Sequence, residues 1–181
     1  SVGGAGTLDL GIYSLTVANT ADLSLVGLSG TSSSSFTKTG TGSLNLIGDN
    51  GFAGKFYINE GTLQISTESA LGDSKEIEWN GGTLRISISG ADDVDTDNTY
   101  TLNDGGGTFE VDESRSLQVY GVISGTGGLT KIGAGSLSLS GDNTYSGDTS
   151  IDGGSLIVSG SLSDSSDVKV GSGGTYQLAA N

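Results

Sequence analysis

The stretch Lys131–Gly147 reads KIGAGSLSLSGDNTYSG, and the chain contains a close copy of it 93 residues earlier. Residues Lys38–Gly54 read KTGTGSLNLIGDNGFAG, and ten of the seventeen positions are identical. The match extends without a gap over residues 37–66 and 130–159, with fifteen identities in thirty positions. A chain that repeats itself in this way is built from repeated structural units.

Around these copies, apolar residues alternate with polar ones at a period of two, which predicts short β-strands with one face turned inward. Gly, Asn or Asp separates the strands, as expected of tight turns. No window shows an apolar stripe at helical spacing, so we expect an all-β chain. The predicted inward residues are Leu8/Leu10, Leu15/Val17, Leu23/Leu25, Leu44/Leu46, Leu63/Ile65, Ile77/Trp79, Leu84/Ile86/Ile88, Phe109/Val111, Leu117/Val119, Leu137/Leu139, Leu156/Val158, Val168/Val170 and Tyr176/Leu178.

Many short strands fit either a sandwich or barrel of hairpins or a solenoid of stacked coils. A shorter unit, Gly followed by Thr or Ser and an alternating apolar pair, recurs inside each copy. Its period of about 20 residues is typical of a β-helix. The chain has no Pro, which would interrupt the backbone hydrogen bonds between coils. We therefore predict a parallel β-helix of about eight coils that forms one domain over residues 1–181.

Composition narrows the possible functions. Twenty-one acidic and seven basic residues give a net charge of −14, which repels phosphate groups and argues against nucleic-acid and anionic-membrane partners. The chain has no Cys, so disulfides and thiolate metal sites are excluded. No run approaches the roughly 20 apolar residues of a membrane helix. We expect a soluble segment that does not insert into a membrane.

The stretch Gly121–Val158 combines the patterns G-x-G-x-L-x-K, G-x-G-x-L-x-L-x-G, N-x-Y-x-G and I-x-x-G-x-L. This ordered set resembles the passenger-associated repeat of bacterial autotransporters, the proteins of type V secretion. The copy that begins near Ser32 keeps most of the pattern but has Phe52 in place of Tyr. The resemblance implies a right-handed parallel β-helix stalk that is exported through a C-terminal outer-membrane barrel. It also implies an extracellular location on the surface of a Gram-negative bacterium.

Catalytic chemistry has little support in the sequence. The chain has no His and no Cys, so it lacks the Ser-His and Cys-His pairs of nucleophilic catalysis. Gly72-Asp73-Ser74 lacks the glycines expected after a hydrolase serine. Polysaccharide-acting β-helix enzymes use grouped carboxylates with Ca²⁺ or a basic residue, and only two Arg and five Lys are present. We predict that the protein is not an enzyme and keep this enzyme class as the alternative.

One acidic segment has the spacing of an oxygen-rich Ca²⁺ loop. Asp93, Asp95 and Asp97 stand two residues apart, and Asp104 is the twelfth residue counted from Asp93. Asn98 stands where such loops need Gly, and Thr99–Leu102 already reads as a strand. The alternative is a solvated acidic loop at a corner between coils, and we expect no cofactor to be needed for folding.

The residues that recur in both copies are predicted to be structural. Asp49-Asn50 and Asp142-Asn143 follow a Gly and suit turns, where Asn tolerates a positive φ. Lys38 and Lys131 are structural by the family resemblance. Phe52 and Tyr145 are expected to cover the core at a corner, and Trp79 is expected to fill the core rather than to bind sugar.

The outward strand positions are mixed and polar, without the regular Thr-x-Thr ladder of an ice-binding solenoid. We therefore predict a structural stalk of an autotransporter passenger that mediates adhesion or self-association. Its partner would be another copy of the chain, through end-to-end or lateral stacking, or a surface protein or glycan. Besides the enzyme, a self-assembling surface-layer or filament subunit is an open alternative.

Overall fold

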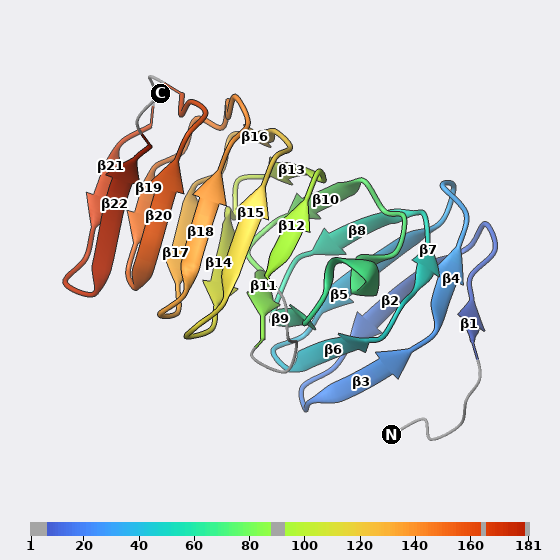
Figure 1. Cartoon of the computed structure of the whole chain (residues 1–181). Helices are drawn as coiled ribbons and strands as arrows, with labels where there is room; N and C mark the ends of the chain where they lie inside the picture. The colour runs from blue at the N-terminus through green and yellow to red at the C-terminus, as the bar shows by residue number, and fades with distance from the viewer. Residues whose placement is uncertain (1–6, 88–92, 164–165, 180–181) are drawn as a thin grey trace.

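The computed structural model describes residues 7–87, 93–163 and 166–179, and in it the chain winds into a parallel β-solenoid (Figure 1). Successive strands occupy three faces in turn, and the strand pairs of the described residues are all parallel. Because each coil bonds to the coils before and after it, the backbone groups of the strands are paired along the solenoid axis.

We name the three faces by their order along the chain. Face 1 consists of β2 (Ser14–Ala18), β5 (Ser35–Thr39), β8 (Lys55–Ile58), β10 (Glu76–Trp79), β13 (Thr99–Leu102) and β16 (Ile123–Gly125). Face 2 consists of β3 (Leu23–Val26), β6 (Ser43–Ile47), β9 (Thr62–Ile65), β11 (Thr83–Ile86), β14 (Gly107–Val111), β17 (Leu129–Ile132), β19 (Thr149–Ile151) and β21 (Val168–Val170).

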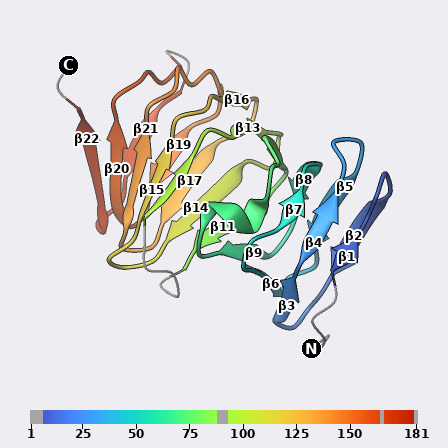
Figure 2. The same ribbon diagram turned by 45° about the vertical axis from the view of Figure 1, so that its right-hand side comes forward.

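Face 3 is split into two sheets. The first consists of β1 (Leu8–Asp9), β4 (Leu28–Gly30) and β7 (Gly51–Phe52). The second consists of β12 (Val94–Thr96), β15 (Ser116–Val119), β18 (Ser136–Leu139), β20 (Gly154–Val158) and β22 (Gly174–Leu178). A single 3₁₀ turn, η1 (Glu68–Leu71), follows β9 at the break, and the turned view in Figure 2 shows it between the two sheets.

The coil length agrees with the periodicity of the sequence. The register pairs Ser43 with Thr62 in one of the shortest coils and Thr83 with Thr108 in the longest of the paired coils. Within the described part of the chain, face 2 contains eight strands, one for each coil. The prediction of an all-β parallel solenoid with about eight coils is confirmed. None of the described residues form a helix that is long and apolar enough to cross a membrane.

The core is a column of the predicted inward residues. From β6 to β20 the apolar pairs are almost completely buried, including Leu44/Leu46 and Leu137/Leu139. Leu8, Val170 and Leu178 are 37%, 50% and 67% exposed, because only one neighbouring coil of the described chain covers the first and last coils. Ile88 lies outside the described residues.

Aromatic side chains fill the column in two groups. Phe36, Phe52 and Phe56 contact one another with ring centroids 4.8 to 6.4 Å apart. Trp79 stacks on Tyr100 at 5.2 Å and meets the edge of Phe109 at 4.9 Å, and all three rings are buried. Trp79 is thus part of the core, as predicted.

The 3₁₀ turn η1 was not predicted from the sequence. It buries Ala70 and Leu71 and ends at Gly72, which has a φ of 69°. A Cβ on Gly72 would lie 2.6 Å from the carbonyl oxygen of Phe52, so only glycine fits against β7 here.

Candidate functional site

The repeated lysine of the first copy is a buried clamp. Lys38, in β5, is completely buried, and its Nζ donates hydrogen bonds to the carbonyl oxygens of Thr39 (2.8 Å) and Gly40 (2.6 Å) in its own corner. It also donates to the carbonyl oxygen of Glu60 (3.2 Å), which lies in the corner of the next coil. The ammonium therefore supplies the donors that three corner carbonyls need and joins two coils.

The second copy forms the same clamp. The Nζ atom of Lys131, in β17, donates to the carbonyl oxygens of Ile132 (2.7 Å), Gly133 (2.9 Å) and Gly153 (3.2 Å), the last from the next coil. Burial lowers the pKa of Lys131 to about 8, and the charge of Glu110 opposes this shift. Burial also lowers the pKa of Lys38. Both lysines are structural, as predicted.

The repeated asparagine is a second clamp. The Oδ1 atom of Asn50 accepts the N–H of Leu28 (2.7 Å) in the preceding coil, and its Nδ2 donates to the carbonyl oxygen of Ala70 (2.7 Å) in the following coil. The side chain of Asn143 likewise accepts the N–H of Ile123 (3.0 Å) and donates to the carbonyl oxygen of Ser161 (3.0 Å). Each asparagine therefore bridges three successive coils.

The two copies lie on different faces of the solenoid. The strand of Lys38 belongs to face 1, whereas the strand of Lys131 belongs to face 2. Phe52 lies on face 3, whereas its counterpart Tyr145 lies on face 1, beside β16. The backbone next to Tyr145 pairs with β16, since the N–H of Thr144 donates to the carbonyl oxygen of Ile123 (2.8 Å). The second copy is therefore rotated by one face relative to the first.

Because of this rotation, the residues that recur in both copies can be assigned to the interior of the solenoid and not to a shared outer surface. The recurring lysine, asparagine and aromatic positions are all buried or bonded between coils wherever they fall, and Phe52 and Tyr145 are both fully buried. The outward residues of the two copies point in different directions. A ligand that contacted one flat side of the solenoid would not meet the same residues of both copies, so the recurring residues serve the coil itself.

Three of the four carboxylates of the candidate Ca²⁺ loop each contact a different residue, and the fourth is exposed. Asp93 accepts the N–H of Ser116 (3.1 Å), and Asp104 accepts the hydroxyl of Thr126 (2.6 Å). Asp97 forms an ion pair with Lys75 (2.6 Å), and this hydrogen bond lowers the pKa of Asp97. Asp95 is exposed on β12.

Among the residues that the structure describes, no three acidic side chains gather closely enough to hold a metal ion. The spacing in the sequence mimics a Ca²⁺ loop, but β12 and β13 extend that segment along two faces. The four carboxylates are therefore not brought together, and whether calcium affects the protein stays a prediction.

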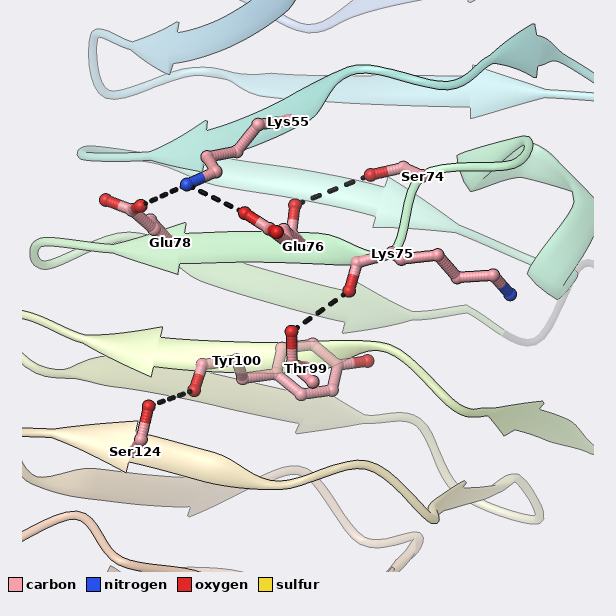
Figure 3. Close-up of polar contacts among 8 residues, drawn as sticks. All are labelled: Lys55, Ser74, Lys75, Glu76, Glu78, Thr99, Tyr100 and Ser124. Atoms are coloured by element: carbon pink, nitrogen blue, oxygen red, sulfur yellow. Dashed lines mark hydrogen bonds and ion pairs between the residues drawn. The ribbon is translucent and has the colours of Figure 1, made fainter. Parts of the chain in front are cut away.

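The exposed cations of the chain are held by carboxylates. Lys55 on β8 donates to Glu76 (2.8 Å) and Glu78 (2.7 Å) on β10 (Figure 3). These bonds raise the pKa of Lys55. Arg85 donates to Asp112 (3.0 Å), and Lys169 pairs with Asp148. The exposed positive charges are thus neutralised locally, and the surplus of the surface charge is negative.

Face 2 carries a row of hydroxyl groups that the sequence analysis missed. The residue at or near the start of successive strands is an outward Ser or Thr, and the strand register aligns these residues along the axis. The row consists of Ser43, Thr62, Thr83, Thr108, Thr130 and Ser150. The recurring Gly-Ser/Thr pair was the available signal, but only the register shows that the hydroxyls share one line.

Comparison with known proteins supports the repeat assignment. The family model of the passenger-associated-transport-repeat matches residues 36–65 and 129–158. A stretch of 53 residues is 47% identical to the adhesin BmaC autotransporter of Brucella suis biovar 1 (strain 1330). That match covers 29% of this chain but only 2% of the adhesin, so the chain is similar to a small part of that protein. No solved structure matches the chain.

The two family matches coincide with the two clamped copies within one residue at each end. Their lysines, asparagines and alternating apolar pairs are the residues that carried the resemblance. The chain therefore contains two passenger-associated-transport repeats, and the predicted resemblance to autotransporter passenger sequence is confirmed.

Proposed function

We propose that the chain is a stalk segment of an autotransporter passenger on the surface of a Gram-negative bacterium, where it contributes to adhesion. The observation that carries the proposal is that the residues repeated in both copies are buried or form hydrogen bonds between coils. The clamps of both repeats serve the rod, which leaves its outward faces for contact with a partner. The similarity to an autotransporter adhesin supports the same role.

Adhesion through such a rod needs no catalytic centre. We propose that the chain is not an enzyme, in keeping with the adhesin similarity, and that the contacts are distributed over a long polar face. Incubation with uncharged and acidic polysaccharides, followed by measurement of new reducing or unsaturated ends, tests the enzyme alternative. The release of such ends would contradict the proposal.

Adhesion is tested with beads coated with the purified chain, applied to cultured epithelial cells and to extracellular matrix. Beads coated with the Leu137→Asp variant, which we expect to unfold, and beads coated with albumin are the controls. We expect binding above both controls. Binding equal to that of albumin beads would overturn the adhesive role. Antibodies against the chain should label intact bacteria that produce the protein, which tests the surface location.

A further inference from the structure

We infer that face 2 is a docking surface for an extended, uncharged polysaccharide. This inference rests on the adhesive role proposed above and names the chemical class of the ligand. It is carried by the arrangement of two rows of polar side chains on the longest uninterrupted sheet of the solenoid.

The first row is the line of six hydroxyls from Ser43 to Ser150. Neighbouring strands are about 4.8 Å apart, so the row extends over about 24 Å. Ser150 donates to Asp152 (2.9 Å), whereas the hydroxyls of the other five make no side-chain hydrogen bond within the described chain. A hydroxyl both donates and accepts, which is what the hydroxyl groups of a sugar require.

The second row lies two residues further along the same strands. It consists of Ser24, Asn45, Gln64, Arg85 and Glu110, which the register places side by side. Arg85 is held by Asp112 (3.0 Å) and Glu110 (3.6 Å), whereas the amides of Asn45 and Gln64 can both donate to and accept from the hydroxyls of a sugar ring. An extended polysaccharide that lies along the axis would offer roughly one ring to each strand.

The other two faces fit less well. On face 1, Tyr57 and Glu78 interrupt the row of hydroxyls. Two further hydroxyls of this face are used within the protein, since Thr99 donates to the carbonyl oxygen of Lys75 (3.1 Å) and Ser124 to that of Tyr100 (3.4 Å), as Figure 3 shows. Face 3 has a shorter row of Ser116, Ser136, Ser155 and Thr175, and η1 interrupts that face. Among the described residues, face 2 therefore offers the longest row of aligned hydroxyls, and five of its six members have no side-chain hydrogen bond.

Charge favours an uncharged ligand. The chain carries a net charge of −14, and the exposed cations of the described residues are paired with carboxylates. A sulfated or uronic-acid polymer would meet repulsion without a free cation to bind it. An open cavity of about 190 Å³ beside the first row is lined by Thr108, Thr130, Asp104 and Asp148 together with glycine backbone, and it can accept a hydroxyl-rich side branch.

The test measures depletion of the folded chain from solution by particles of cellulose, chitin and mannan, with heparin–agarose as the polyanion. The face 2 variant combines Thr62→Val, Thr83→Val and Thr108→Val, which remove hydroxyls but keep the β-branched shape. The matched control combines Ser116→Ala, Ser136→Ala and Ser155→Ala on face 3. Circular dichroism and the thermal midpoint establish that both variants are folded.

We expect the wild type to bind at least one uncharged polymer and not heparin. The face 2 variant should bind that polymer about tenfold to hundredfold more weakly, since three hydrogen-bonding groups are lost. The face 3 variant should bind like the wild type. Undiminished binding by the face 2 variant, or a loss confined to the face 3 variant, would overturn the inference.

The bead assay separates this inference from the adhesive role. If coated beads adhere to cells but the chain binds none of the uncharged polymers, the polysaccharide surface is wrong and adhesion stands. The same conclusion follows if adhesion survives removal of cell-surface glycans but not treatment with protease. If the beads fail to adhere as well, the adhesive role is wrong too.

Discussion

Lys38 and Lys131 occupy the same position of the same repeat but lie on different faces of the solenoid. Thirteen steps around the three faces separate β5 from β17, which is four full coils and one further face. The lysine clamp therefore forms at two of the three corners, with the same contacts at each.

The first prediction concerns these lysines. Replacing Lys131 with Met keeps the aliphatic stem but leaves three corner carbonyls without a donor, and we expect a loss of about 1–3 kcal/mol in the free energy of unfolding. Lys38→Met should cost a similar amount, because the clamp is the same on either face. Chemical denaturation followed by the fluorescence of the single Trp79 measures both. A large cost at one position and none at the other would contradict the equivalence of the two corners.

The second prediction concerns the asparagine clamp. Asn143→Ala should lower the free energy of unfolding by about 1–3 kcal/mol, because the buried N–H of Ile123 loses its acceptor and the carbonyl of Ser161 keeps only the backbone N–H of residue 143. Asp142→Ala, at the exposed neighbouring position, is the control and should change it by less than about 0.5 kcal/mol. Equal effects at the two positions would show that the turn, not the bridge between coils, is what Asn143 supports.

The third prediction compares the two sides of β18. Leu137 is completely buried, so Leu137→Asp should destabilise the protein by several kcal/mol or prevent folding. Ser138 points outward, and Ser138→Asp should be nearly neutral. Thermal unfolding followed by circular dichroism compares the variants, and similar midpoints would refute the inward direction of Leu137.

Sequence reasoning was most accurate where the signal is local. The period of two identifies the strands, and the recurrence of the Gly-Ser/Thr unit identifies the coils, because each coil is one supersecondary unit. The burial of Trp79 was predicted for the same reason, because it depends on which side of a strand the residue faces. The structural role of Lys131 was predicted from the family resemblance instead.

Properties that depend on accumulated coil length could not be predicted. The coils differ in length, since the coil from Thr83 to Thr108 contains more residues than the coil from Ser43 to Thr62. No short sequence motif gives the total length of several successive coils. The displacement of the second repeat by one face and the row from Ser43 to Ser150 both follow from that total length. The spacing of Asp93 to Asp104 resembles a Ca²⁺ loop in the sequence, but Val94–Thr96 and Thr99–Leu102 are strands, and the four described carboxylates do not gather at one point.

The fourth prediction concerns pH. Lys131 has a pKa of about 8 in the folded protein and an ordinary value of 10.5. Between these values the unfolded state binds more protons, so this group stabilises the fold increasingly as the pH rises from about 8 toward 10.5. The wild type should therefore gain stability relative to Lys131→Met between about pH 7.5 and 9.5. A constant difference between the two proteins over this range would show that the carbonyl cage keeps the ammonium charged.

The last prediction concerns calcium. Asp97 is already paired with Lys75, and Asp93 and Asp104 bond to Ser116 and Thr126 in other coils, so a bound ion would have to break these contacts. We therefore expect the thermal midpoint to be the same in excess calcium and in excess chelator. Lys75→Met is the informative variant, because it frees the carboxylate of Asp97 without adding a ligand. A rise of many degrees with calcium in the wild type would restore the loop as a metal site. A rise confined to Lys75→Met would show that the lysine occupies the place of a cation.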